Sequence, residues 1–240
     1  MGDQEMTAKA SNVEFWSRLE AQIAQYDLLT HPFYQAWSMG ELTREELKEY
    51  AAEYWHHVSA FPSYLSALHA GMPDGEERRE VLRNLAEEEG VDAPLGRPHS
   101  DLWMDFAEGM GATRAEVLGR TVQPEMAALI AGYRELMQEK PVVAMAALYA
   151  YESRVPGIAK TKAEGLAAHY ATTGAAARYF TLHETADVHH AAVWRELMNA
   201  QLAKDPEAAE AALTVAERAA KALWMALDGV ERERLKARAN

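Results

Sequence analysis

The sequence contains no cysteine among its 240 residues. This absence excludes disulfides, thiol nucleophiles, iron–sulfur clusters and zinc–thiolate sites together. Basic residues are also scarce, with 24 Lys and Arg against 37 Asp and Glu, which gives a formal net charge of −13. An acidic chain without a basic block binds nucleic acid and anionic membranes poorly, so we expect neither as a partner.

Long apolar runs and targeting signals are missing as well. The longest apolar run, residues 142–151, is about half of what a membrane span requires. The opening MGDQEMTAKA has no basic region followed by an apolar core, so no secretory signal is expected. With 49% hydrophobic and 25% charged residues, the composition predicts a cytoplasmic protein with one globular domain over residues 1–240.

Apolar residues recur at helical spacing along nearly the whole chain, and no segment shows a sustained alternation of period two. Glycine and proline predict a loop over 90–98, and Pro156 should bend a long helix over about 141–169. A final alanine-rich helix is expected to end near Gly229, before a mobile charged tail over 230–240. These patterns predict an all-α protein, a single compact bundle of seven to nine helices.

Three titratable residues lie where a bundle helix normally carries apolar ones. His183, Asp187 and His190 follow the spacing i, i+4, i+7, so they share a helix face with Tyr179 and Trp194. Unpaired burial would cost each of them several kcal/mol, so they need partners. A hydrogen-bonded core network is one interpretation, and ligation of a transition metal is the other.

A second set of polar residues lies on one seam of the helix predicted over 141–169. Glu152 and Lys162 share that seam, and Pro156 should bend the helix close to Glu152. A buried salt bridge between these two residues is the structural interpretation. In the functional interpretation, burial lowers the pKa of Lys162 and makes its amine available as a nucleophile.

A third set is Glu88 and His99. Glu88 lies three residues after the apolar Leu85 and is expected to face inward, whereas Glu87 and Glu89 are expected to face solvent. Carboxylates and imidazoles that project from facing helices into a bundle core form the dimetal sites of several oxygenases. Three of each kind nearly neutralise two divalent cations, and the candidates are Glu88, His99, Glu152, His183, Asp187 and His190.

Several motifs resemble the family of the chlamydial protein associating with death domains, a branch of the haem-oxygenase-like dimetal oxygenases. The similarity covers residues 28–196, although the loop between Glu88 and His99 is a few residues longer than in the chlamydial protein. The resemblance implies a haem-oxygenase-like fold of the TenA/PqqC type. The motifs that carry it are HPFYQAWSMGELTREELKEYAAEYWHHVSAFPSYLSALH, RNLAEEEG, HSDLW, ALYAYESRVPGIAKTK and YFTLHETADVHH.

The resemblance also implies a self-sacrificing synthase that makes para-aminobenzoate for folate biosynthesis, with a single turnover per chain. Tyr34 matches the tyrosine that supplies the ring, and Lys162 matches the lysine that gives the amino group. Tyr50 and Tyr151 match tyrosines near the metal that assist radical transfer. The implied cofactors are two divalent metal ions, Fe/Fe or Fe/Mn, with O₂ and an external reductant. The six ligands that the family pattern gives are the six candidates named above.

Other functions share parts of this pattern. A related oxygenase acting on a diffusible small molecule would use the same ligands. The thiamin-degrading branch of the fold needs a cysteine, and a cofactorless ring oxidase of the pyrroloquinoline quinone type would not need six ligands. A non-catalytic binding module with a metal-free polar core is a further alternative. For any of these a homodimer is expected, because closed symmetric dimers are the commonest oligomers.

Overall fold

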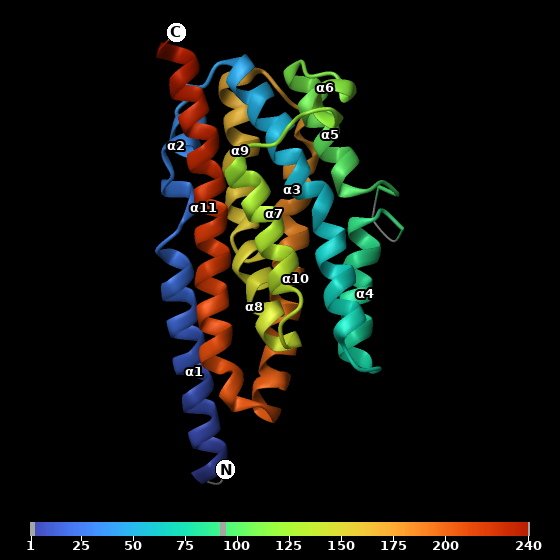
Figure 1. Ribbon diagram of the computed structural model, residues 1–240, viewed down its shortest axis with the longest axis vertical. Coiled ribbons are helices and arrows are strands. Elements are labelled where there is room, and N and C mark those ends of the chain that lie inside the picture. The colour runs from blue at the N-terminus through green and yellow to red at the C-terminus, as the bar shows by residue number, and fades with distance from the viewer. Residues whose placement is uncertain (1–2, 92–94, 240) are drawn as a thin grey trace.

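A computed structural model describes residues 3–91 and 95–239, and over these residues the chain is an all-α bundle (Figure 1). The predicted fold class is therefore confirmed. The described residues form eleven α-helices, close to the expected seven to nine, and nine of them have 12 residues or more. They are α1 (Asp3–Ala24), α3 (Arg44–Gly71), α4 (Glu76–Glu88), α5 (His99–Met110), α7 (Pro124–Leu136), α8 (Pro141–Glu152), α9 (Val155–Tyr170), α10 (Arg178–Lys204) and α11 (Ala209–Ala239). Two shorter helices, α2 (Pro32–Ser38) and α6 (Arg114–Leu118), and 3₁₀ turns at Leu28–Thr30, Gly174–Ala177 and Pro206–Ala208 complete the described elements.

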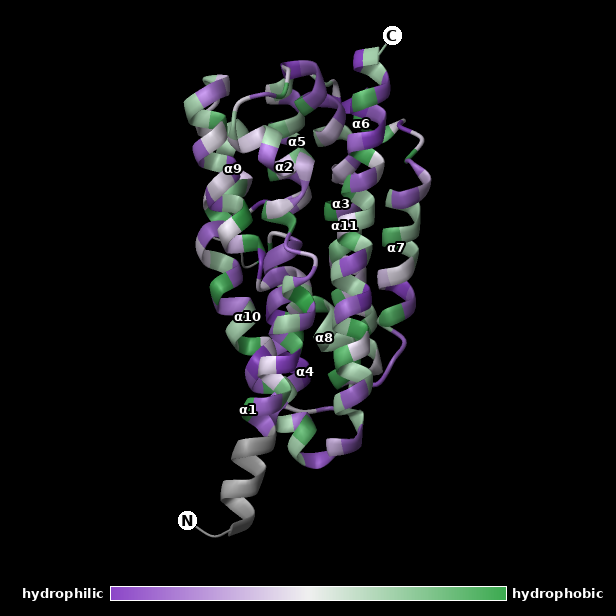
Figure 2. Cartoon of the chain, turned by 90° about the vertical axis from the view of Figure 1, so that its left-hand side faces the viewer, coloured by the Kyte–Doolittle hydropathy of each residue, from purple (hydrophilic) through white to green (hydrophobic). Residues whose placement is uncertain are grey.

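The bundle is organised around α8. This helix is apolar on all sides, and it packs against α10 on one side and α11 on the other. α1 and α7 pack against α11, while α4 and α5 pack against α3 (Figure 1). The outer helices, such as α11, interleave hydrophilic and hydrophobic residues, as Figure 2 shows, because only one face of each is buried.

The expected bend near Pro156 is present. α8 ends at Glu152 and α9 begins at Val155, with Pro156 in its first turn. Proline has no N–H to donate to the carbonyl of Glu152, so the helical hydrogen bond is missing at the point where the helix breaks. The break leaves Glu152 at the carboxyl end of the most buried helix, with its side chain 1% exposed.

The charged tail differs from the expectation, because α11 continues through Gly229 to Ala239. A Cβ at Gly229 would lie 3.0 Å from side-chain oxygens of Gln123 and Glu125, so this glycine permits a close helix contact and is no helix stop. The last turns are held by Arg238, which donates to the carboxylate of Glu46 and, at 2.8 Å, to the backbone carbonyl of Glu41. The residues expected to be mobile are therefore helical, at least as far as Ala239.

The predicted loop over 90–98 connects α4 to α5, and its residues 92–94 lie outside the described ranges. Within those ranges, no helix is both long enough and apolar enough to cross a membrane.

Candidate active site

The six candidate ligands come together in two buried clusters. Glu88, His99 and His183 form the first cluster, and Glu152, Asp187 and His190 form the second. In each cluster, one donor atom from every residue lies within 4.8 Å of the others. All six side chains are at most 5% exposed, although four helices contribute them.

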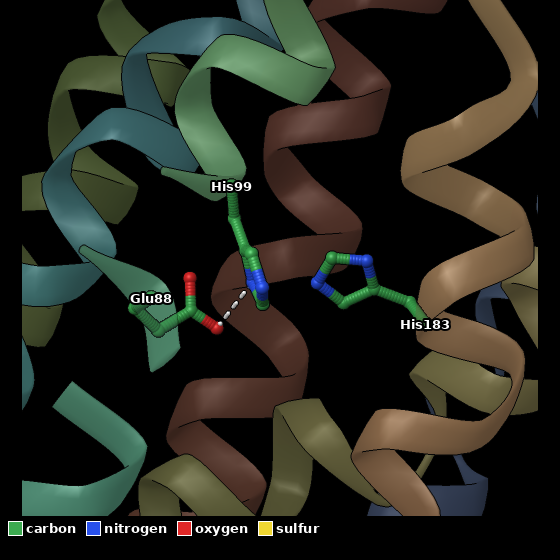
Figure 3. Close-up of side chains that lie close together, drawn as sticks. All are labelled: Glu88, His99 and His183. Carbon is green, nitrogen blue, oxygen red and sulfur yellow. Dashed lines mark ion pairs between the residues drawn. The ribbon is translucent and has the colours of Figure 1, made fainter. Parts of the chain in front are cut away.

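The first cluster joins the end of α4, the start of α5 and the second turn of α10. Figure 3 shows the Glu88 carboxylate and the His99 and His183 imidazoles facing one another. His99 Nδ1 lies 3.0 Å from Glu88 Oε1, yet it makes no hydrogen bond. His183 Nδ1–H donates to the backbone carbonyl of Tyr179 at 2.7 Å, which leaves Nε2 with its lone pair. Despite the longer loop before it, His99 therefore lies in the cluster.

The second cluster is made of α8 and α10. His190 Nδ1 lies 3.1 Å from Asp187 Oδ1 and 3.5 Å from Glu152 Oε1. Asn84 Nδ2 donates to Glu152 Oε1 at 3.2 Å, and the Trp194 indole N–H donates to Glu152 Oε2. Both oxygens of this carboxylate are thus fixed in orientation.

Glu87 corrects one expectation, because its carboxylate is not simply solvated. Glu87 Oε2 accepts a hydrogen bond from His190 Nε2 at 2.8 Å, and its side chain is 35% exposed. The apolar spacing of α4 did not indicate this contact. Asn84 was also missed, although it lies four residues before Glu88 and hence on the same helix face.

The electrostatics of both clusters favour a bound cation. Burial would lower the pKa of His190, but hydrogen bonds to Asp187, Glu152 and Glu87 outweigh it and raise that pKa well above its ordinary value. Burial raises the pKa of Asp187. Burial also opposes protonation of His99, yet the charge of Glu88 overcomes it and raises the pKa of His99. In each cluster a carboxylate thus stabilises a positive charge on a neighbouring imidazole.

The donor set fits two divalent transition-metal ions. Carboxylate oxygens and imidazole nitrogens are ligands that iron and manganese accept. His99 Nδ1 is buried and its neighbour at 3.0 Å is the carboxylate of Glu88, a second candidate ligand, so the donor atoms of the first cluster converge as metal ligands do. The two buried clusters therefore fit a dimetal site.

A separate group joins Tyr34, Tyr50 and Lys162, from α2, α3 and α9. Lys162 Nζ donates to Tyr34 Oη at 2.8 Å and to Tyr50 Oη at 2.6 Å, and the two phenol oxygens are 3.0 Å apart. Each of the three side chains is at most 4% exposed. Nζ bonds two phenols here, and so the salt bridge to Glu152 that the sequence allowed is not formed.

Burial keeps this group uncharged. It lowers the pKa of Lys162 well below its ordinary value, and it raises the pKa of Tyr34 and Tyr50 well above theirs. These shifts favour the uncharged forms, a neutral amine against neutral phenols. A neutral amine has a free lone pair, which an ammonium lacks.

Contacts of His31 and Trp37 hold α2, the helix that carries Tyr34. His31 caps the first turn of α2, where its Nδ1 accepts from Phe33 N–H, and its Nε2 lies 3.2 Å from Asp228 on α11. Trp37 Nε1–H donates to the carbonyl of Lys162 at 3.3 Å, which ties α2 to α9.

A small cavity lies next to this group. Its volume is about 20 Å³, and its lining includes Tyr34, Lys162, Tyr54, Tyr151 and Tyr179. The Tyr179 ring stacks on His183 of the first cluster, with ring centres 4.0 Å apart. Tyr50 and Tyr54 have ring centres 5.4 Å apart. Aromatic side chains therefore fill the space between the first cluster and Tyr34.

Comparison with known proteins places this arrangement in a family. The sequence model of the iron-containing redox enzymes matches residues 48–224. The chain belongs to this family. A 4-aminobenzoate synthase of Nitrosomonas europaea is 38% identical over 228 residues, which cover 90% of each chain. A 4-aminobenzoate synthase of Chlamydia pneumoniae is 35% identical and covers 86% of this chain and 90% of its own.

Solved structures agree with the fold of these iron-containing redox enzymes. A TenA homologue from Pseudomonas syringae pv. tomato superposes with a TM-score of 0.76 at 18% identity, covering 91% of this chain and 93% of its own. A domain with a heme oxygenase-like fold from Shewanella denitrificans gives 0.73 at 20% identity, covering 92% and 93%. The predicted haem-oxygenase-like architecture is thereby confirmed.

Proposed function

We propose that this chain is a self-sacrificing 4-aminobenzoate synthase, in which Tyr34 supplies the ring and Lys162 the amino nitrogen. The observation that carries the proposal is the 2.8 Å contact between Lys162 Nζ and Tyr34 Oη inside a buried site. The 4-aminobenzoate synthases that are 35–38% identical over most of the chain support the same product.

The chemistry of the product matches the tyrosine side chain. 4-Aminobenzoate carries an amino group and a carboxyl group on opposite ring positions, where tyrosine carries its phenol oxygen and Cβ. Nitrogen must therefore replace the phenol oxygen, which leaves as water, and the Cε–Nζ bond of Lys162 must break to release that nitrogen. Cβ must also separate from Cα and become the carboxyl carbon. The second change is an oxidation, for which O₂ and an external reductant are the co-reactants.

Lys162 is held in position for the replacement of the phenol oxygen by nitrogen. Its Nζ lies 4.2 Å from the centre of the Tyr34 ring, and a 2.6 Å hydrogen bond to Tyr50 also holds it in place. Because burial favours the neutral form of the amine, its nitrogen is more readily available as a nucleophile than that of a solvated ammonium.

The two clusters would hold the metal pair, either Fe/Fe or Fe/Mn, through Glu88, His99, Glu152, His183, Asp187 and His190. Two such ions supply O₂ activation, which protein side chains alone do not provide. We assign to Tyr50 and Tyr151 a role in radical transfer to Tyr34, because Tyr151 lines the cavity beside Tyr34 and Tyr50 bonds it directly.

The cavity size argues against an oxygenase that acts on a diffusible substrate. About 20 Å³ holds one or two waters, since one water needs at least about 10–15 Å³ on this measure. Drug-sized ligands occupy pockets of about 300–1,000 Å³. An aromatic or fatty substrate therefore has no room beside Lys162 unless the helices separate.

The test is a single-turnover assay on protein labelled with ¹³C-tyrosine and ¹⁵N-lysine. The protein is incubated in air with ferrous iron, with or without manganese, and a reductant, and the product and the protein are analysed by mass spectrometry. Both labels should appear in 4-aminobenzoate, with at most one product per chain and a matching loss from residue 34. Product from a Tyr34→Phe variant, or repeated turnover, would contradict the proposal. A cytoplasmic homodimer stays a prediction, which sedimentation and cell fractionation can check.

A further inference from the structure

Helix α4 reaches both clusters, although it contributes a ligand only to the first. Asn84, Glu87 and Glu88 follow the spacing i, i+3, i+4, so they lie on adjoining positions of one helix face. Glu88 belongs to the first cluster. Asn84 bonds Glu152 and Glu87 bonds His190, and both of these partners belong to the second.

The two ring nitrogens of His190 have different surroundings. Nδ1 faces the carboxylates of Asp187 and Glu152, whereas Nε2 faces Glu87. A carboxylate accepts hydrogen bonds and cannot donate them, so Nε2 must carry the proton in the contact with Glu87. A metal ion binds the nitrogen that offers a lone pair. Nδ1 also bonds a carboxylate, that of Asp187 at 3.1 Å, but Asp187 and Glu152 are the other donor residues of the second cluster. An ion bound among them would replace the proton of Nδ1, while the contact with Glu87 keeps the proton of Nε2, so Nδ1 would be the ligand atom.

Glu87 itself is badly placed to be a ligand. Its oxygen lies at Nε2, on the opposite edge of the imidazole from Nδ1, while the other two donor residues of the second cluster lie at Nδ1. Its side chain is 35% exposed, unlike the six ligands. Glu87 therefore lies outside the set of ligands and would act on a bound ion through His190.

We infer that Glu87 is a positioning residue of the second cluster, where it fixes the Nε2–H form and the ring orientation of His190 and so strengthens binding of a divalent cation. This inference rests on the proposed dimetal site. Outer hydrogen bonds of this kind typically change metal affinity about 10–100-fold.

The test measures binding of Mn²⁺ to metal-free protein under nitrogen, in competition with a chromophoric chelator. Glu87→Leu removes the acceptor, and Glu87→Gln keeps an oxygen that can accept the Nε2–H bond. Glu89→Leu is the matched control, because Glu89 is exposed and two residues further along the chain. We expect wild type, Glu87→Gln and Glu89→Leu to bind two ions with similar affinities. Glu87→Leu should bind one ion as wild type does and the other about 10–100-fold more weakly.

Two results would overturn the inference while leaving the dimetal site intact. One is wild-type affinity at both clusters in Glu87→Leu. The other is an equal loss in Glu87→Gln and Glu87→Leu, which would indicate that the charge or direct ligation matters and the hydrogen bond does not. A wild-type protein that binds no Mn²⁺ would instead overturn the dimetal site, and this inference with it. Thermal melting of each metal-free variant shows that it is folded, and Glu87→Ser replaces Glu87→Leu if that variant is not.

Discussion

Metal loading should stabilise the folded chain strongly, because both clusters exist only when four helices are packed together. A ligand that binds the folded state alone adds about 2.7 kcal/mol when its free concentration is 100 times its Kd. Two clusters then add about 5.4 kcal/mol. For a chain of this size each kcal/mol raises the melting temperature by about 2–4 °C, so the expected rise is roughly 10–20 °C.

The assay is differential scanning calorimetry under nitrogen, with Mn²⁺ set at 100 times the measured Kd and with a chelator as reference. His99→Ala removes a donor from the first cluster and His190→Ala one from the second, so each variant should keep roughly half of the rise. His189→Ala is the control, because His189 is exposed beside His190 and should leave the rise unchanged. The reasoning is refuted if wild type shows no rise, or if both cluster variants keep all of it.

Three further predictions concern buried groups near the site. Lys162→Met should raise the free energy of unfolding at pH 7 relative to wild type. The difference between the two free energies of unfolding should widen as the pH falls from 9, because residue 162 of wild type binds a proton in the unfolded chain that it does not bind in the folded chain. If urea denaturation gives the same pH dependence for both proteins, this prediction is contradicted. Burial lowers the pKa of His57 to about 3, so wild type should lose about 2.3 kcal/mol through this group between pH 6.5 and 4.5. His57→Phe should lack that part of the pH dependence in urea unfolding with a chelator present, and an unchanged slope would show that His57 is not kept neutral. Gly165→Ala should destabilise the protein by about 1–3 kcal/mol, because its Cβ would lie 2.8 Å from Trp37. Gly132→Ala is the control, because a Cβ at Gly132 meets open space and should not destabilise the protein. Equal losses of stability in the two variants would show that the contact with Trp37 is not the cause.

The metal-binding face of α10 could be predicted because burial and periodicity coincide there. His183, Asp187 and His190 share a stripe with Trp194, and an inward polar stripe has few physical explanations. Tyr34 could not be found in this way. It is one of ten tyrosines, and only the family resemblance singles it out.

The failures have physical causes too. Helical spacing assigns one face to the core, but α4 packs against α3 and also contacts α5 and α10, so a long side chain such as Glu87 reaches a partner from a half-exposed position. Gly229 resembled a helix stop because glycine is common just past helix ends. Only the tertiary contact with Gln123 and Glu125 explains why glycine is needed inside α11.

The burial of Tyr34 has a consequence for the protein after its reaction. If the ring departs as product, a void opens in the interior where a nearly fully enclosed side chain once packed. Deleting a large buried aromatic group typically costs about 3–5 kcal/mol, a large share of the 5–15 kcal/mol that holds an ordinary domain together. The protein that remains after the reaction would then have a lower free energy of unfolding, and it would be degraded more readily as a result of the event that released its product.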